Sequence, residues 1–266
     1  MRYDAIVVGG GPAGSTCAWR LQRAGLRVAV VGRSQFPRDK VCAGWITPQV
    51  VRTLALDLAD YAKCATLQPI ETFGVGRIGR GRTVTVSYGT VVSYGIRRCE
   101  FDAYLLRRCG AERLLGVPVT RIEQTGGSWV VNGQLQAPVL VGAGGHFCTV
   151  ARLLGRKQRG RGGVGGELEV GTHLSRDAQD LDGRAGPPQL YFSDDLLGYG
   201  WVFPKGNYVN VGLGRFGERQ LTDATERFVE WLRREGRIPP DLANRGRWHG
   251  HAYARSEEHT SELQSH

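Results

Sequence analysis

The stretch "YDAIVVGGGPAG" (Tyr3–Gly14) decides the fold of this chain. Its apolar run is typical of a short buried strand, and Pro12 suits the first turn of the helical pattern that follows. Between strand and helix, Gly9, Gly11 and Gly14 match the pattern G-x-G-x-x-G. The first glycine makes the tight turn, the second lets the backbone approach a pyrophosphate, and the third lets the helix pack on the strand. The stretch therefore predicts a Rossmann-like unit that binds a dinucleotide at a helix N-terminus.

The second strand of this unit lacks the acidic residue that usually binds the ribose of the nucleotide. The run "LRVAVVGRS" (Leu26–Ser34) places Gly32 where Asp or Glu is expected. Loss of a charged hydrogen-bond acceptor costs about 1.5–3 kcal/mol of binding free energy. Arg33 and Ser34 are able to bind a 2′-phosphate instead. From this loop alone, an NADP-binding domain is therefore an alternative.

Length and composition indicate a globular protein of one large or two ordinary domains. The 266 residues are 41% apolar, and the net charge of +10 comes largely from arginine. The densest basic run, "GRKQRGRGG" (Gly155–Gly163), has no interleaved aromatic residues to stack on bases. We therefore attribute the high arginine content to a GC-rich coding sequence and interpret this run as a surface loop. We predict no nucleic-acid partner.

The cysteines, histidines and serines give no sign of a metal or hydrolytic site. The six cysteines are scattered without the spacing of zinc ligands, and no serine lies in a G-x-S-x-G motif. The N-terminus has no pattern of a secretion signal, and no stretch approaches the roughly 18 apolar residues of a membrane span. A cytoplasmic protein with reduced thiols and no metal is expected.

Alternating strand and helix patterns predict a mixed α/β (α+β) architecture. Helical patterns cover 12–25, 47–56, 99–110, 148–154 and 223–236. Strand patterns cover 3–9, 26–31, 70–96, 128–133, 137–145, 167–174, 189–194 and 198–214. We expect a Rossmann-like nucleotide-binding domain at 1–160, with a strand-rich insertion at about 66–96. An interleaved antiparallel β-sheet domain at 161–254 is expected to bind the substrate.

Three further motifs point to FAD by resemblance. They are "FPRDKVCAG" (Phe36–Gly44), "RRCEFD" (Arg97–Asp102) and "VLVGAGG" (Val139–Gly145). Together with the glycine loop, and in this order, they resemble the flavoprotein group that includes p-hydroxybenzoate hydroxylase, and most closely the geranylgeranyl reductase family. The resemblance runs over residues 1–254. It implies FAD as the cofactor, Arg98 beside the nucleotide, and the "KVCAG" loop near the flavin.

The cofactor-binding residues that we predict combine the glycine loop with the segments of this resemblance. They are Gly9, Gly11, Pro12, Ala13, Gly14, Arg33, Lys40, Cys42, Ala43, Arg98, Val119, Gly142 and Gly145. Lys40 raises the positive potential beside Cys42, although a small buried residue is the plainer interpretation of that cysteine. The family's Gly-Ala-Asp-Gly is Gly-Ala-Gly-Gly here (Gly142–Gly145), so a second carboxylate that would anchor FAD is missing.

A strand with an aromatic face is the candidate wall of the substrate site. In "GYGWVFPKGNYVNVGLG" (Gly198–Gly214), Tyr199, Trp201 and Phe203 alternate along the strand and so share one face. Such a face is usually core, but the run also resembles the family's aromatic-Trp-x-Phe-Pro segment, which lines the substrate cavity. We therefore predict these three residues as substrate-binding, with the aliphatic opposite face in the core.

The pairing of this hairpin depends on its turn. A four-residue turn at 204–207 would place Gly212 opposite Tyr199 and Asn210 opposite Trp201. A glycine across from an aromatic ring leaves a gap that suits the close approach of a flat or apolar ligand.

The resemblance implies an FAD-dependent oxidoreductase that reduces a C=C bond of an apolar, isoprenoid-like small molecule by hydride transfer from reduced flavin. NAD(P)H or another reductant is the implied electron donor, and peripheral contact with a membrane is left open. A flavin-dependent monooxygenase or halogenase of the same fold stays an alternative, because the sequence does not reveal how reduced flavin reacts with oxygen. An inactive nucleotide-binding fragment is a third reading. No residue is assigned a catalytic role.

The last twelve residues, "RSEEHTSELQSH" (Arg255–His266), differ in composition from the rest of the chain. They contain no glycine and one aliphatic side chain, and they resemble the translation of a sequencing-library adapter. The family's third flavin element, a strand running into Gly-Asp-Ala, does not occur in the sequence. We therefore expect a fragment with a disordered, non-native tail at 255–266 and weak FAD binding.

Overall fold

The computed structural model describes residues 1–145, 148–154, 169–179, 186–216, 221–238 and 249–255. The chain divides into two compact units. The first consists of Met1–Asp39 and Cys99–Gly165, and the second of Lys40–Arg98 and Gly166–His266. The strands within 66–96, expected as an insertion in the nucleotide-binding domain, group with the second unit.

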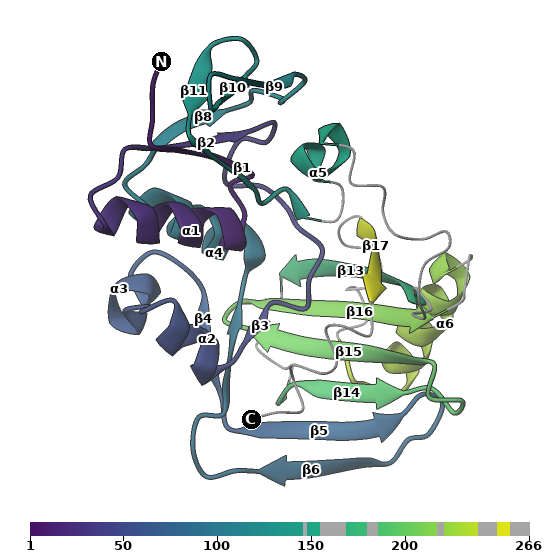
Figure 1. Ribbon diagram of the computed structural model, residues 1–266. Helices are drawn as coiled ribbons and strands as arrows, with labels where there is room; N and C mark the ends of the chain where they lie inside the picture. The colour runs from purple at the N-terminus through teal and green to yellow at the C-terminus, as the bar shows by residue number, and fades with distance from the viewer. Residues whose placement is uncertain (146–147, 155–168, 180–185, 217–220, 239–248, 256–266) are drawn as a thin grey trace, which may run out of the picture. The chain divides into compact units, whose positions relative to one another are not determined.

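The first unit is built on a four-stranded parallel sheet. Across the sheet the strands are β12 (Val139–Gly142), β1 (Ala5–Val8), β2 (Val28–Gly32) and β8 (Glu112–Leu115). Their apolar runs suit strands that are covered on both faces. Helices α1 (Pro12–Arg23) and α4 (Arg98–Arg108) cover one face (Figure 1). Their side chains Ala18 and Leu106 pack against Val7 and Val30. The loop after β1 lies where the strand order reverses, which is where such sheets bind nucleotides.

The opposite face of this sheet is covered by a small antiparallel sheet and a short helix. The small sheet has the order β11 (Leu135–Ala137), β10 (Ser128–Val131) and β9 (Ile122–Thr125). The helix is α5 (Thr149–Leu153). Val131, Leu135 and Val150 of these elements meet Ile6 and Val31 in an apolar core. The first unit therefore has three layers.

The second unit is built on a seven-stranded sheet (Figure 1). Its strands follow the order β17 (His249–Arg255), β13 (Glu169–Gln179), β16 (Tyr208–Phe216), β15 (Gly198–Lys205), β14 (Gln189–Phe192), β5 (Thr72–Arg77) and β6 (Thr83–Ser87). Neighbouring strands are antiparallel except β14 and β5, which are parallel.

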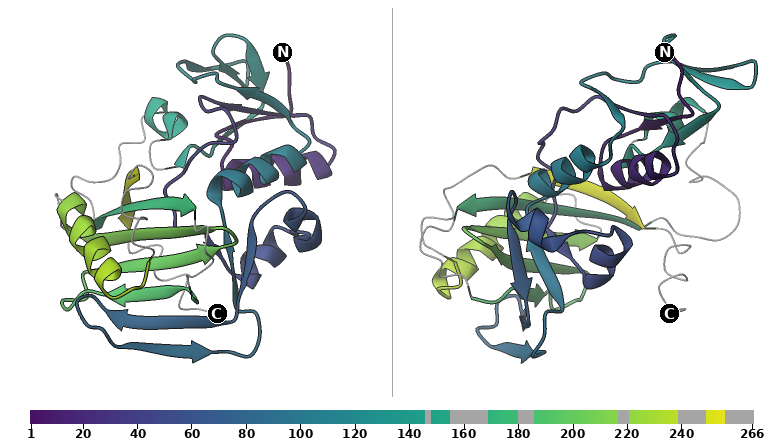
Figure 2. Two further views of the ribbon diagram at one scale, coloured as in Figure 1. Left: turned by 180° about the vertical axis from the view of Figure 1, so that it is seen from behind. Right: turned by 90° about the vertical axis from the view of Figure 1, so that its left-hand side faces the viewer.

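One face of the seven-stranded sheet is covered by α6 (Leu221–Arg234), which lies beside the strands in both views of Figure 2. Phe228 and Leu232 of this amphipathic helix pack against Val202 and Val211. Gly200 leaves room for the helix, because a Cβ at this position would lie 2.4 Å from the ring of Phe228. The aliphatic face of the hairpin is thus core, as predicted.

A three-stranded sheet and two short helices complete the second unit. The sheet has the order β3 (Trp45–Ile46), β7 (Ser93–Ile96) and β4 (Leu67–Ile70). The helices are α2 (Pro48–Thr53) and α3 (Leu58–Ala62). Both helices have a side-chain N-cap, because Thr47 accepts from the Val50 N–H and Asp57 accepts from the Asp60 N–H.

The β15–β16 hairpin has a different register from the one predicted. Lys205 pairs with Tyr208, so the turn contains only two residues, and Trp201 lies opposite Gly212. Gly206 has φ +55°, a conformation that two-residue hairpin turns require and that glycine adopts without strain. The expected four-residue turn is therefore wrong. The register changes by an even number of residues, so every side chain stays on its predicted face.

Some expectations fall outside the described residues. They concern the basic run at 155–163 and residues 256–266 of the tail. Arg255, expected in that tail, ends β17 and pairs with Glu169 of β13. Within the described part of the chain, no helix has the length and apolar character to cross a membrane.

Candidate nucleotide site and apolar pocket

The glycine loop of the first unit leaves no room for side chains at two positions. Gly9 has φ +118°, and a Cβ there would lie 2.4 Å from the carbonyl oxygen of Ala143. A Cβ on Gly14 would lie 1.8 Å from the carbonyl oxygen of Gly9. Both distances are to backbone atoms, which cannot move without displacing β1 or β12. The loop therefore requires glycine at both positions.

The N-terminus of α1 is open to a ligand. Gly11 is the N-cap, no side chain caps the helix, and its first turn holds no acidic residue. Pro12 occupies the first helical position and Ala13 is exposed, so the first free N–H groups come from Ala13 and Gly14. These groups, with the partial positive charge of the helix end, suit the oxygens of a phosphate.

A guanidinium group lies beside this loop. Among the described residues, the only atom within 4 Å of a Cβ built on Gly11 is Nη2 of Arg38, at 3.4 Å. The same Nη2 lies 3.3 Å from Oδ2 of Asp102, a fully buried carboxylate on α4. The guanidinium also lies 4.9 Å from the centre of the Phe36 ring. The buried carboxylate thus holds the partly exposed Arg38 guanidinium where a pyrophosphate would meet the loop.

Arg38 is not among the cofactor-binding residues predicted from the sequence. It lies within the "FPRDKVCAG" motif, where Lys40 was predicted as the positive charge beside the cofactor. Asp102 in the "RRCEFD" motif is the feature of the sequence that could have indicated Arg38, because an acidic residue on the buried side of a helix needs a cationic partner.

The remaining predicted cofactor-binding residues have different environments. Gly142 ends β12 and packs against α5, since its Cβ would lie 3.0 Å from the Cys148 sulfur. No described atom lies within 4 Å of a Cβ built on Gly145. Arg33 is exposed just after β2. Val119 is buried in the apolar core with Ile6 and Val131, so its environment is that of a core residue. Lys40, Cys42, Ala43 and Arg98 belong to the second unit.

Substitution of Arg38 provides a test of the loop's electrostatics. We expect Arg38→Gln to weaken FAD binding about 10- to 100-fold, because one charge-assisted hydrogen bond contributes about 1.5–3 kcal/mol. The double variant Arg38→Gln/Asp102→Asn avoids an uncompensated buried carboxylate and should show the same loss with better folding. Arg113→Gln, at an exposed arginine of β8 outside the predicted site, is the matched control. Unchanged affinity, measured by flavin fluorescence titration of folded variants, would exclude Arg38 from the site.

Substitution of Gly32 tests the missing acidic residue. The nearest atoms to a Cβ at this position are the Gly10 nitrogen at 3.8 Å and the Gly9 Cα at 4.0 Å, so a side chain fits beside the loop. We expect Gly32→Glu to strengthen FAD binding up to about tenfold for each 1.4 kcal/mol gained at the ribose. Gly32→Gln has the same size without the charge and should gain less. If affinity stays level or falls in both variants, Arg33, Ser34 or the backbone already holds the ribose.

The second unit contains an apolar pocket of about 260 Å³. It is lined by Val41, Cys42, Ala43, Trp45, Leu190, Tyr199, Trp201, Phe203 and Gly214. All three residues of the predicted aromatic face are among these, together with Cys42 and Ala43 of the predicted cofactor loop. None of the lining residues carries a formal charge at neutral pH.

The three aromatic residues of β15 have different environments. Trp201 is 3% exposed, and its Nε1–H donates to Oδ1 of Asn210 at 2.6 Å. Phe203 is also buried, and its ring lies 5.8 Å from that of Trp45. Tyr199 is 43% exposed at the pocket's edge. Trp201 and Phe203 therefore serve both the core and the pocket wall, whereas Tyr199 is free of a core role.

The polar groups of the pocket are the Tyr199 hydroxyl and the Cys42 thiol. Burial of the hydroxyl, with a smaller effect from the neighbouring Cys42, raises the pKa of Tyr199 above its usual value. The Gly44 N–H donates to the Cys42 sulfur at 3.3 Å. A Cβ built on Gly44 would clash with Nζ of the fully buried Lys205. Trp45, Leu190 and Lys205 were not predicted.

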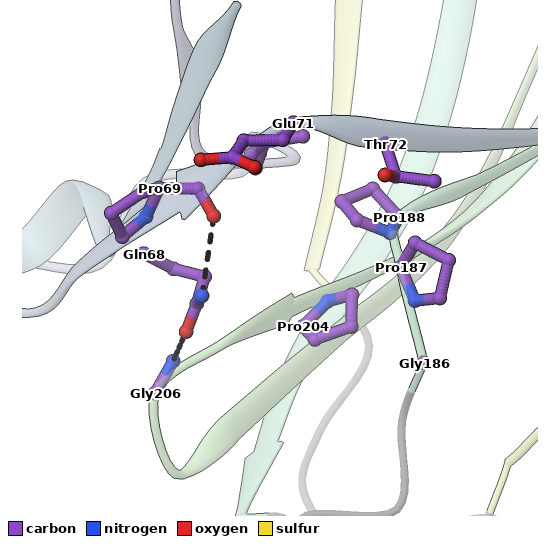
Figure 3. Close-up of a pocket in the computed structure, with 10 residues that line it drawn as sticks. Gln68, Pro69, Glu71, Thr72, Gly186, Pro187, Pro188, Pro204 and Gly206 are labelled. Carbon is purple, nitrogen blue, oxygen red and sulfur yellow. Dashed lines mark hydrogen bonds between the residues drawn. The ribbon is translucent and has the colours of Figure 1, made fainter. Parts of the chain in front are cut away.

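A larger cavity of about 430 Å³ lies elsewhere in the second unit (Figure 3). Prolines 69, 187, 188 and 204 surround it, with polar groups from Gln68, Glu71 and Thr72. Gln68 fixes one side, because it donates to the Pro69 carbonyl at 3.2 Å and accepts from the Gly206 N–H at 3.4 Å. No predicted site residue lines this cavity, so we place the candidate substrate site in the smaller, apolar one. Among the described residues, no group of His, Cys, Asp and Glu side chains is arranged to hold a metal ion.

Comparisons with known proteins agree with this geometry. Residues 4–76 match the family model described as FAD dependent oxidoreductase. The geranylgeranyl diphosphate reductase of Rhodobacter capsulatus is 32% identical over 230 residues, which are 80% of this chain and 55% of that protein. The chain therefore spans little more than half the length of this curated relative.

Solved structures share the fold. A geranylgeranyl bacteriochlorophyll reductase-like protein from Thermoplasma acidophilum superposes with a TM-score of 0.68 at 21% identity, over 96% of this chain and 66% of that one. A flavin-dependent brominase gives a TM-score of 0.63 at 20% identity, over 96% and 68% of the two chains.

The parallel sheet, the glycine loop and these likenesses define a flavoprotein with a Rossmann-type FAD-binding fold. Residues 4–76 match the FAD-dependent oxidoreductase family, and the chain is similar to geranylgeranyl reductases. FAD is the cofactor of this family, and the residues present fit its pyrophosphate. The fit rests on the open space above Gly11, the uncapped helix N-terminus and the Arg38 guanidinium.

Proposed function

We propose that this protein reduces C=C bonds of an apolar, isoprenoid-like substrate. The observation that carries the proposal is the pocket of the second unit, whose lining residues are apolar or aromatic and uncharged. An ionised substrate group would lose its hydration there without a compensating charge, whereas an isoprenoid chain loses nothing. The reductase relative is consistent with this choice.

The two units divide the work in this proposal. The first unit binds the nucleotide half of FAD through the glycine loop, the α1 N-terminus and Arg38. The second unit holds the apolar substrate against Trp201 and Phe203, which exclude water. When bound and reduced, FAD supplies a hydride, and NAD(P)H or another reductant restores it.

Reduction of a C=C bond also needs a proton. Two pocket groups carry one, the Tyr199 hydroxyl and the Cys42 thiol. Because a phenol is protonated at neutral pH and Tyr199 lines the pocket, we propose Tyr199 as the group that holds this proton near the substrate.

A monooxygenase or halogenase is the second candidate, and the fold shared with the brominase makes it reasonable. The two candidates differ in the fate of oxygen. A reductase adds two hydrogen atoms to its substrate without oxygen, whereas the alternatives consume oxygen and add an oxygen or halogen atom.

The test is a single-turnover reaction under anaerobic conditions. The full chain is incubated with FAD, dithionite and geranylgeraniol, and the product is analysed by mass spectrometry. The proposal predicts a gain of two hydrogen atoms per reduced bond without oxygen, with a slower reaction in Tyr199→Phe and no oxygenated product when air is admitted. Rapid oxygen consumption with an oxygenated product would favour the monooxygenase.

A further inference from the structure

The turn between β14 and β15 presents two leucines to solvent. This leucine turn consists of residues 193–197, with Leu196 75% exposed and Leu197 51% exposed. Full burial of a leucine side chain stabilises a protein by about 1.5–3 kcal/mol. The two exposed leucines at this turn contribute only a small part of that stabilisation to the fold. Adjacent exposed leucines at the tip of a turn suggest a contact with an apolar partner.

The leucine turn is braced by polar contacts beneath its tip. Both oxygens of Asp195 receive N–H groups of Arg215 on β16, at 3.1 and 2.5 Å. These bonds, with a further one from Ser193, hold the pKa of Asp195 well below its usual value. The Leu197 N–H also donates to Asp195, at 3.1 Å. The brace fixes the backbone while the leucines project outward.

The backbone of the turn places a leucine where another residue would be easier to accommodate. Leu196 has φ +58°, a left-handed conformation that is uncommon for residues other than Gly, Asn and Asp. Folding alone would favour asparagine or glycine here. Nothing that Leu196 contacts within the described residues explains a leucine in this conformation, because the side chain is 75% exposed.

The leucine turn is continuous with the apolar pocket. Phe192 and Tyr199 flank the turn, with ring centres 6.3 Å apart, and Tyr199 lies 5.7 Å from Trp201. This aromatic row leads from the turn tip to the buried pocket wall. Amphipathic aromatic side chains are enriched at membrane–water interfaces.

We propose that the leucine turn inserts into the surface of a lipid membrane, so that an apolar substrate moves along the aromatic row from lipid to pocket. The choice of lipid and the path of the substrate both rest on the proposed function, whereas the exposure of the two leucines and the bracing of the turn do not. The occupant is lipid rather than a protein because the row joins the tip to a pocket suited to a membrane-dissolved molecule. The net charge of +10 favours an anionic surface.

The test is flotation of the full chain, without flavin or substrate, with vesicles of phosphatidylcholine and phosphatidylglycerol. We expect the wild-type chain to float with the vesicles and Leu196→Asp/Leu197→Asp to bind at least roughly tenfold less. Aspartate tolerates the left-handed conformation, so this variant should keep its melting temperature. The matched control, Leu26→Asp/Val117→Asp, adds the same charge at two exposed apolar residues of the first unit and should bind like wild type.

Three outcomes would overturn the inference. They are a wild-type chain that stays unbound, a turn variant that binds as well as the control, and a turn variant that instead turns a dimer into a monomer in gel filtration. The last would identify a protein interface. Because the vesicles contain no isoprenoid and the chain no flavin, a negative result leaves the proposed reduction intact.

Discussion

Replacement of Gly14 by alanine is expected to abolish FAD binding and to destabilise the first unit by about 3 kcal/mol or more. The added Cβ would lie 1.8 Å from the Gly9 carbonyl oxygen. Relief of this clash requires α1 to move away from β1, which opens the loop that holds the pyrophosphate. Overpacking usually costs about 1–3 kcal/mol, and a backbone clash in a rigid loop belongs at the upper end.

The control for this prediction is Gly32→Ala, since its Cβ meets no atom closer than 3.8 Å. Thermal unfolding followed by circular dichroism and titration with FAD would be measured for both variants. Gly32→Ala should behave like wild type. If Gly14→Ala kept wild-type stability and affinity, the close packing of α1 on the loop would not be required for the site.

The second large effect is expected at Trp201. We expect Trp201→Ala to destabilise the second unit by about 3–5 kcal/mol, because it removes a buried indole from the cluster with Phe73 and Phe203. It also removes the 2.6 Å hydrogen bond to Asn210. A role in substrate binding alone would weaken ligand binding and leave the flavin content unchanged. The 3% exposure of Trp201 now makes loss of folded protein the larger effect.

Tyr199→Ala separates the pocket from the core. Tyr199 is 43% exposed, so its removal should leave the unfolding midpoint almost unchanged while weakening the binding of an apolar ligand. Trp201→Phe retains most of the packing and loses only the indole N–H. A stable Trp201→Ala variant with normal ligand binding would contradict both roles of this residue.

The fold was predictable where a motif carries a local mechanical requirement. The glycine loop, the strand before it and the helix after it follow from steric rules that act within a dozen residues. The aromatic and aliphatic faces of β15 were predictable for the same reason, because alternation needs no knowledge of partners. The hairpin register was not, since a turn at Gly206 and one at 204–207 preserve the same faces.

The arrangement of distant segments was not predictable. Nothing local in "FPRDK" shows that Arg38 reaches the glycine loop, because its partner Asp102 lies far along the chain. The grouping of residues 40–98 with the second unit depends on pairing between β5 and β14. The exposure of the two leucines was also not predictable, because the sequence indicates only that "SDDLLG" forms a turn between two strands.

A competition titration on the full chain tests the central claim most directly, namely that the glycine loop with Arg38 binds the diphosphate of FAD. Fluorescence anisotropy of FAD is measured with increasing protein, and ADP is then added as the competitor that shares the adenosine and pyrophosphate. The account predicts saturable FAD binding that ADP displaces, that Arg38→Gln weakens and that Gly14→Ala abolishes. A folded chain that binds neither nucleotide, or that binds FAD without competition from ADP, would contradict it.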